Sequence, residues 1–452
     1  MLSVGVVIIL RSITKTVTVT YSFLLELKLE LRESSSSKSC TVDVSDKFVL
    51  HSLGLNLIKD EKADTRIWCW SSTSIFALLS IVLPGYLSDK AREFTEKREK
   101  SICEAPLKPL AQAIPNDKLT ELPGLPKAYV YELVGQHNVP GSIERWADFV
   151  VQLTNFIYQS HGLLLANNTP IIEEGGVTFT KEWLSSKGCY ALGPSMLPGE
   201  AKFHSEESLR GQEQEVITFL DKVYDSHGKN SLLYMSFGSA AFPNGDTPWQ
   251  LIEIILDMKI PFVRETISSG KHYLCNLPWS QIFTMPHGVT SINTLPPELG
   301  SKLESSELAL VTKWAPQRTI LDHPVTGIFF THGGQGSITE SSSLGVPMII
   351  WPCQGDQPYN ALNLTINLKV AYQLVEVRIG HGLKPLYRGY KPIGTKEAID
   401  TEFRQVLKNA FGSDGDAKRE TALEISKRLR ETWEEGGGAM IELRRMLQEN
   451  FS

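Results

Sequence analysis

Apolar and polar residues alternate regularly in the second half of the chain. From residue 231 onward, short apolar runs typical of buried strands alternate with stretches whose apolar residues recur at helical spacing. This pattern predicts strands at 232–237, 308–313, 327–331 and 346–351 and helices at 249–258, 316–321 and 337–344. Strands that alternate with helices indicate βαβ units and a parallel sheet.

The first half is less regular. Residues 4–10 and 16–23 are rich in Val, Ile and Thr and predict strands, as does the apolar run 162–166. Residues 143–158 have the spacing of an amphipathic helix.

A polar, turn-rich stretch at 193–208 separates the two halves. Helices are predicted after it at 211–224 and at the end of the chain, over 418–430 and 440–451. We therefore expect an N-terminal domain over 1–195, a linker over 196–212 and a C-terminal domain over 213–452. The last helices are expected to return to the N-terminal domain.

Composition excludes several classes of protein. The 452 residues are 42% hydrophobic and 21% charged, which is typical of globular domains, and the net charge of -6 favours neither nucleic acid nor anionic lipid as a partner. The six cysteines form no CxxC pair and match no zinc pattern, which predicts reduced thiols, no metal site and a cytoplasmic location. The apolar N-terminus is shorter than the ~20 residues of a membrane-spanning helix, although peripheral membrane contact stays open.

Candidate chemistry lies in residues 314–357. His332 follows an apolar strand, the glycine-rich turn Gly333-Gly334-Gln335-Gly336 comes next, and Ser337 is expected to begin a helix. Glycines allow close backbone approach, and free N–H groups at a helix start bind an anion such as phosphate. Open parallel sheets bind ligands at the carboxyl ends of their strands, where this turn lies.

Other side chains of the segment suit the rest of a nucleotide sugar. Glu340, one turn into the helix, can accept hydrogen bonds from a diol such as a ribose, and Trp314 offers a flat face for a base. Asp356 and Gln357 follow the strand 346–351 and suit sugar hydroxyls. Each of these features alone is weak evidence for a nucleotide-sugar site. The interpretation depends on their occurring together, in this order, on consecutive turns.

The segment is similar, over 44 residues without a gap, to the signature of family 1 UDP-glycosyltransferases, the plant secondary-product glycosyltransferase box. Residues 234–239 and 191–194 resemble further parts of that family, so the similarity covers roughly residues 120–450. Two positions depart from the plant form, because Gln335 stands where Trp is usual and Gly336 where Asn is usual.

The resemblance implies an α/β protein with the GT-B fold, in which two Rossmann-like domains face each other across a cleft. It implies inverting transfer of a hexose from a UDP-sugar to a hydroxyl of a small lipophilic or phenolic acceptor, with no metal or other cofactor. In this family, a Gln at the last position of the signature, here Gln357, occurs more often in enzymes that use glucose as the donor sugar. The resemblance also implies which residues contact the UDP-sugar. Trp314 and Ala315 would contact uracil, Gln317 would lie near the nucleoside, and Glu340 would bind the ribose. The diphosphate would be held by His332, Ser337, Ser239 and the turn Gly334, Gln335 and Gly336, and the sugar by Asp356 and Gln357. A nucleotide-sugar epimerase is the alternative from another enzyme class.

The catalytic residue is not identified. Members of the family carry a base histidine in a Gly-His turn after the first strand, whereas this chain offers Arg11, Ser12, Thr14 and Lys15 in that loop, none of which is a base near neutral pH. The other histidines of the first half are His51, His137 and His161. The chain is therefore expected to bind a donor and transfer sugar poorly, either as a non-catalytic binder or as an enzyme whose N-terminal domain is incomplete or whose base is relocated. Aromatic residues that can line an acceptor pocket or belong to the core are Trp68, Trp70, Phe76, Tyr86 and Trp146.

Overall fold

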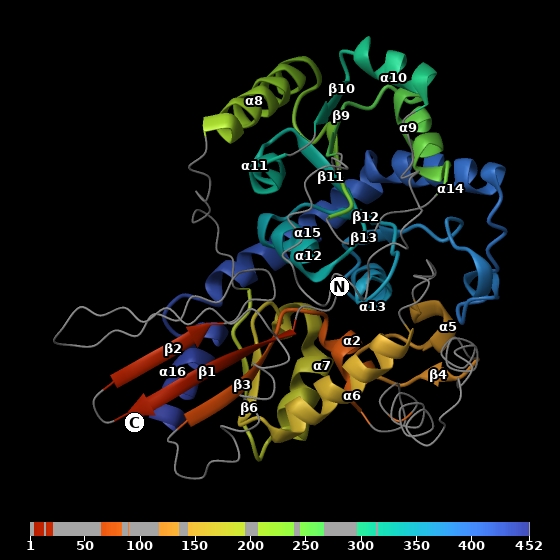
Figure 1. Cartoon of the computed structure of the whole chain (residues 1–452). Helices are drawn as coiled ribbons and strands as arrows, with labels where there is room; N and C mark the ends of the chain where they lie inside the picture. The colour runs from red at the N-terminus through yellow and green to blue at the C-terminus, as the bar shows by residue number, and fades with distance from the viewer. Residues whose placement is uncertain are drawn as a thin grey trace.

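The computed structural model describes residues 4–12, 15–20, 65–83, 89, 117–134, 143–194, 207–238, 245–265, 296–312 and 315–451. Within these ranges the chain forms two α/β units, each built around a largely or wholly parallel sheet (Figure 1). Among the described residues, no helix combines the length and the apolar character that a membrane crossing requires.

The N-terminal unit has a five-stranded sheet in the order β2-β1-β3-β6-β7. Its strands are β1 (Val4–Ser12), β2 (Lys15–Thr20), β3 (Thr65–Ser71), β6 (Gly162–Leu165) and β7 (Cys189–Ala191). Strands β3, β6 and β7 are parallel, whereas β1 runs antiparallel to both β2 and β3. The carboxyl ends of the three parallel strands therefore share one edge of the sheet.

The end of β1 does not lie at that edge. Two residues separate β1 from β2, and so short a connection joins antiparallel strands only. Val4 lies opposite Ser71 and Leu10 opposite Thr65, so β1 ends at the amino end of β3, and in Figure 1 it runs away from the C-terminal unit. Arg11 and Ser12, which end β1, therefore lie at the opposite edge of the sheet from the carboxyl ends of β3, β6 and β7.

Helices cover the N-terminal sheet and form its core. They are α2 (Ile75–Val82), α5 (Val130–Leu133), α6 (Ile143–Gln159) and α7 (Pro170–Trp183), with a small hairpin of β4 (Leu119–Thr120) and β5 (Ala128–Tyr129) beside them. Every residue of α2 is buried, and all but Ser80, whose hydroxyl donates to the Ala77 carbonyl, are apolar. The turn at Gly124 packs on α7 so closely that a Cβ atom there would lie 2.7 Å from the Cα atom of Gly175.

The C-terminal unit has a six-stranded parallel sheet in the order β10-β9-β8-β11-β12-β13. The strands are β8 (Leu232–Ser236), β9 (Phe262–Glu265), β10 (Ala309–Thr312), β11 (Thr326–Thr331), β12 (Met348–Ile350) and β13 (Ala371–Gln373). The central strand β11 is buried along its whole length, as expected where helices cover both faces of a parallel sheet.

The helices of this unit alternate with its strands. They are α8 (Glu207–His227), α9 (Thr247–Asp257), α10 (Pro297–Glu304), α11 (Gln317–Asp322), α12 (Gln335–Leu344), α13 (Gln357–Leu362), α14 (Lys396–Ala410) and α15 (Ser413–Glu431), with a π turn at Asn363–Asn367 and a 3-10 turn at Gly380–Leu383. Helix α8 begins inside the expected linker 196–212, because the good helix formers around Gly211 outweigh the cost of that one glycine.

The last helix, α16 (Gly438–Phe451), lies against the N-terminal sheet (Figure 1). The guanidinium of Arg445 donates to the Cys189 carbonyl at 2.8 Å, and the Tyr190 hydroxyl donates to Glu449 at 2.5 Å. On the way to α16, the Trp433 indole donates to the Pro194 carbonyl at 2.7 Å. The end of the chain therefore ties the two units together.

Replacement of Phe403 by Ala tests the core of the C-terminal unit. Phe403 in α14 is fully buried, and its ring centroid lies 5.3 Å from that of Phe330 in β11. We expect Phe403→Ala to lower the free energy of unfolding by about 3–5 kcal/mol, through lost burial and the cavity left behind. Urea unfolding followed by circular dichroism measures this loss. Leu447→Ala, at a side chain that is 47% exposed, is the control and should change stability by less than about 0.5 kcal/mol.

Candidate functional site

The carboxyl ends of β8 and β11 approach each other closely. Gly238 follows β8 with φ at 65°, a conformation that favours glycine. A Cβ atom on Gly238 would lie 2.8 Å from Cε1 of His332, which follows β11. Glycine at this position therefore allows the His332 ring to lie between the two strand ends.

The glycine-rich turn leads directly into α12. Gly333 has φ at 80°, and a Cβ atom there would lie 2.6 Å from the Ile350 side chain on β12. The Asn360 side chain in α13 donates to the Gly333 carbonyl at 3.0 Å and holds the turn from the other side. Helix α12 begins at Gln335 with Gly334 as its N-cap, two residues before the start expected at Ser337.

This helix start is suited to an anion. Gly334 has no side chain to accept from the first turn, so the N–H groups of that turn can bind a phosphate. Ser337 is nearly buried beside it, whereas Gly336 is exposed. Burial lowers the pKa of His332 to about 3, so its ring is neutral near pH 7 and can offer an N–H donor without a positive charge.

Glu340 and Gln317 form a pair on neighbouring helices. The Gln317 side-chain amide donates to Oε2 of Glu340 at 2.5 Å, and the Tyr234 hydroxyl donates to the Gln317 side-chain oxygen at 3.5 Å. Burial raises the pKa of Glu340, and the bond from Gln317 opposes that rise. Ala315 is buried at the start of this segment, and Trp314 and Ser239 lie outside the described residues.

Asp356 lies at the N-cap of α13 and faces the N-terminal unit. Its Oδ2 atom accepts from the Thr73 hydroxyl at 3.1 Å and from the Ser74 backbone N–H at 3.3 Å. Its Oδ1 atom has no hydrogen-bond partner among the described residues, and burial raises the pKa of the carboxyl. One oxygen of Asp356 therefore joins the two units while the other can accept from a ligand.

Gln357 and Gln335, two of the residues expected to contact the UDP-sugar, also make hydrogen bonds within the protein. The side-chain oxygen of Gln357 accepts from the Cys353 and Gln354 backbone N–H groups at 2.7 and 2.9 Å, so it closes the loop before α13. Gln335 is buried and turned to the N-terminal unit, where its amide donates to the Asn167 carbonyl at 3.2 Å.

The sequence interpretation missed four residues of the N-terminal unit at this edge: Thr73, Ser74, Asn168 and Glu173. The signal for the first two is the polar run 71–74 between an apolar strand and an apolar helix. The signal for the other two is Asn167-Asn168-Thr169-Pro170, a helix start with Thr169 as N-cap and Pro170 in the first turn.

The described part of the N-terminal unit places no histidine at this edge. His161, the one histidine described there, precedes β6 and lies at the amino end of that strand, and His51 and His137 lie outside the described residues. Trp68 and Phe76 are buried in the core. Tyr86 and the side chains of Trp70 and Trp146 lie outside the described residues.

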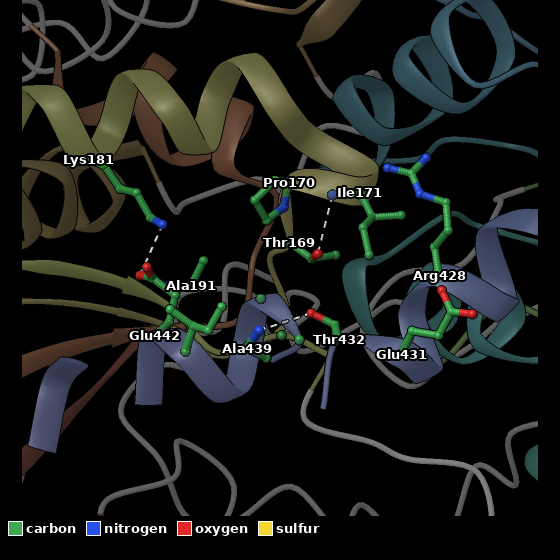
Figure 2. Close-up of a pocket in the computed structure, with 14 residues that line it drawn as sticks. Thr169, Pro170, Ile171, Lys181, Ala191, Arg428, Glu431, Thr432, Ala439 and Glu442 are labelled. Carbon is green, nitrogen blue, oxygen red and sulfur yellow. Dashed lines mark hydrogen bonds and ion pairs between the residues drawn. The ribbon is translucent and has the colours of Figure 1, made fainter. Parts of the chain in front are cut away.

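A cavity of about 420 Å³ lies where the chain crosses between the units (Figure 2). Its walls come from the start of α7, the end of β7, the end of α15 and the start of α16, and Figure 2 shows Lys181 paired with Glu442 across it at 3.0 Å. The basic side chains Lys181 and Arg428 are balanced by Glu431 and Glu442. The cavity contains none of the residues at the carboxyl edge of the C-terminal sheet.

Comparisons with known proteins agree on one family. Residues 293–378 match the family described as "UDP-glucoronosyl and UDP-glucosyl transferase". The fungal UDP-glycosyltransferase eriJ of Hericium erinaceus is 26% identical over 83% of this chain and 72% of that protein. UDP-glycosyltransferase 73B1 of Arabidopsis thaliana is 27% identical over 63% of this chain and 52% of that protein, so the chain spans about half the length of this plant relative.

Two solved plant structures share the fold. A transferase from Siraitia grosvenorii in complex with UDP has a TM-score of 0.58 and 20% identity, over 84% of this chain and 76% of that one. Phytolacca americana UGT2 with UDP-2fluoro-glucose and pterostilbene has a TM-score of 0.55 and 19% identity, over 85% and 70%. With the two sheets above, these matches confirm the GT-B fold of two Rossmann-like units, and the chain is similar to family 1 UDP-glycosyltransferases.

Proposed function

We propose that the chain binds a UDP-sugar at the carboxyl edge of its C-terminal sheet and transfers the hexose to a hydroxyl of a small lipophilic acceptor. The observation that carries this proposal is the arrangement of His332, the start of α12, Glu340 and Asp356 at one end of one parallel sheet. Such an edge is where open α/β sheets bind nucleotides.

Each part of the donor has a group of matching chemistry. The N–H groups at the start of α12, with Ser337 and a neutral His332, can hold the diphosphate through hydrogen bonds instead of a basic field, which fits a chain of net charge -6. Glu340 can accept from the ribose, and the free oxygen of Asp356 from the sugar. We further propose that the side-chain amide of Gln357 binds the sugar and that Trp314 and Ala315 bind the uracil base.

Relatives support the substrate classes. One structural neighbour was solved with UDP-2fluoro-glucose and pterostilbene, and relatives are named as flavonol 3-O-glucosyltransferase and anthocyanidin 3-O-glucosyltransferase. We therefore propose glucose as the sugar and a phenol or lipophilic alcohol as the acceptor. Another relative is named zeatin O-xylosyltransferase, so UDP-xylose belongs in any donor panel. The free, buried thiols of Cys69, Cys189 and Cys353 support a reducing compartment such as the cytoplasm.

A second candidate function is donor binding with little transfer. The observation that favours it is the antiparallel pairing of β1 with β2 and β3, which places the end of β1 at the edge opposite the carboxyl ends of the parallel strands. The nucleophilic hydroxyl then lacks the base histidine that the family carries in the loop after the first strand.

Glu340→Ala tests donor binding. Loss of the carboxylate removes the acceptor proposed for the ribose, and we expect UDP affinity to fall by about 1–3 kcal/mol in calorimetry. Glu424→Ala, on the exposed side of α15, should bind UDP like the wild type. Equal affinity in both variants would remove Glu340 from the site. Binding of NAD instead of UDP would favour a nucleotide-sugar epimerase.

Turnover tests the second candidate. If the second candidate holds, the purified chain transfers glucose from labelled UDP-glucose at about 10²–10⁴-fold below the rate that a positioned base supports, across a panel of phenols, sterols and alcohols. His51→Ala should not change this residual rate. Rapid transfer that His51→Ala abolishes would show that the base is relocated and that the chain is a competent transferase.

A further inference from the structure

Glu173 is a buried carboxylate on the N-terminal unit that the proposed reaction does not use. Its side chain is 1% exposed, and its own backbone leaves the helical conformation of α7, with φ at -131° and ψ at 47°. Burial raises its pKa to about 7. A carboxylate in such a place is tolerated only where hydrogen bonds satisfy it.

Those bonds come from the start of α2. The Glu173 Oε1 atom accepts from the Ser74 hydroxyl at 2.8 Å and from the Ile75 backbone N–H at 2.8 Å. Ser74 is the N-cap of α2, yet its side chain makes no cap bond within the helix. Glu173 therefore provides the acceptor that the first turn of α2 lacks, with its negative charge at the positive end of the helix.

The other oxygen of Glu173 holds a residue just before α7. The Asn168 side-chain amide donates to Oε2 of Glu173 at 2.7 Å and to the Thr73 carbonyl at 2.8 Å. Through Asn168 and Ser74, Glu173 holds Thr73 and Ser74, two of the three residues of the turn between β3 and α2.

The opposite side of the same turn faces Asp356 of the C-terminal unit. Thr73 and Ser74 donate to Oδ2 of Asp356, and Oδ1 has no partner among the described residues. The direction of the Thr73 hydroxyl and of the Ser74 N–H decides which oxygen of Asp356 is engaged and which stays available.

We propose that Glu173 is a positioning residue for the donor sugar: it sets the turn at Thr73 and Ser74, and this turn orients Asp356 so that Oδ1 meets a sugar hydroxyl. The inference rests on the proposed function, because it takes Asp356 as the sugar contact. Gln335 at the start of α12 also donates to Oε2 of Glu173, at 3.4 Å, whereas Asn168 donates to the same oxygen at 2.7 Å. Because the bond from Gln335 is long, we assign Glu173 no contact with the donor and expect nucleotide binding at α12 not to depend on it.

Glu173→Gln tests this role against Glu174→Gln, a matched change at the next residue, which is exposed. An amide has one accepting oxygen where the carboxylate has two, so the substituted side chain cannot satisfy the donors on both sides. We expect UDP affinity to equal that of Glu174→Gln, and UDP-glucose affinity to fall about tenfold, the equivalent of one hydrogen bond. Calorimetry with each ligand measures the two constants, and circular dichroism confirms the fold.

The outcomes separate the two proposals. Wild-type protein that binds no UDP contradicts the proposed function, whatever the variants do. If the wild type binds UDP, equal UDP-glucose affinity in Glu173→Gln and Glu174→Gln overturns the positioning role, as does a parallel loss of UDP and UDP-glucose. If Glu173→Gln fails to fold, Ser74→Ala, which removes one bond to Glu173 and keeps the carboxylate, decides by the same comparison.

Discussion

The turn between β3 and α2 lies between two buried carboxylates, and the relation of the two units depends on it. Glu173 accepts from one side of this turn and Asp356 from the other, so the polar groups of Thr73 and Ser74 are shared between the units. A buried carboxylate is costly unless hydrogen bonds satisfy it, and removing such a donor leaves the carboxylate unsatisfied. The turn therefore constrains how the two units approach each other at the carboxyl edges of their sheets.

The two units contribute different kinds of residue to this edge. On the C-terminal side, β11, the glycine-rich turn and α12 bring His332 and Ser337 to one helix start, and the Gln317 and Glu340 pair joins α12 to the neighbouring helix. On the described part of the N-terminal side, the polar groups at this edge hold the backbone or the other unit and provide no base histidine. The structure thus supports nucleotide binding more strongly than transfer.

The sequence predicts the C-terminal half well because that half is built from consecutive βαβ units, whose periodicity is local. Strands β8, β10, β11 and β12 and helices α9, α11 and α12 lie within a few residues of their expected places. The N-terminal half was less predictable, because the direction of β1 depends on its pairing with β3, over fifty residues later in the chain. Glu173 was missed for a similar reason, since its partners Ser74 and Ile75 are far from it in sequence.

A crystal structure of the chain with UDP bound would locate the nucleotide. We expect the diphosphate at the start of α12, within hydrogen-bond distance of His332 and Ser337, and the ribose hydroxyls on Glu340. A nucleotide bound elsewhere, for example in the cavity between α7 and α16, would show that this edge of the sheet is not the donor site.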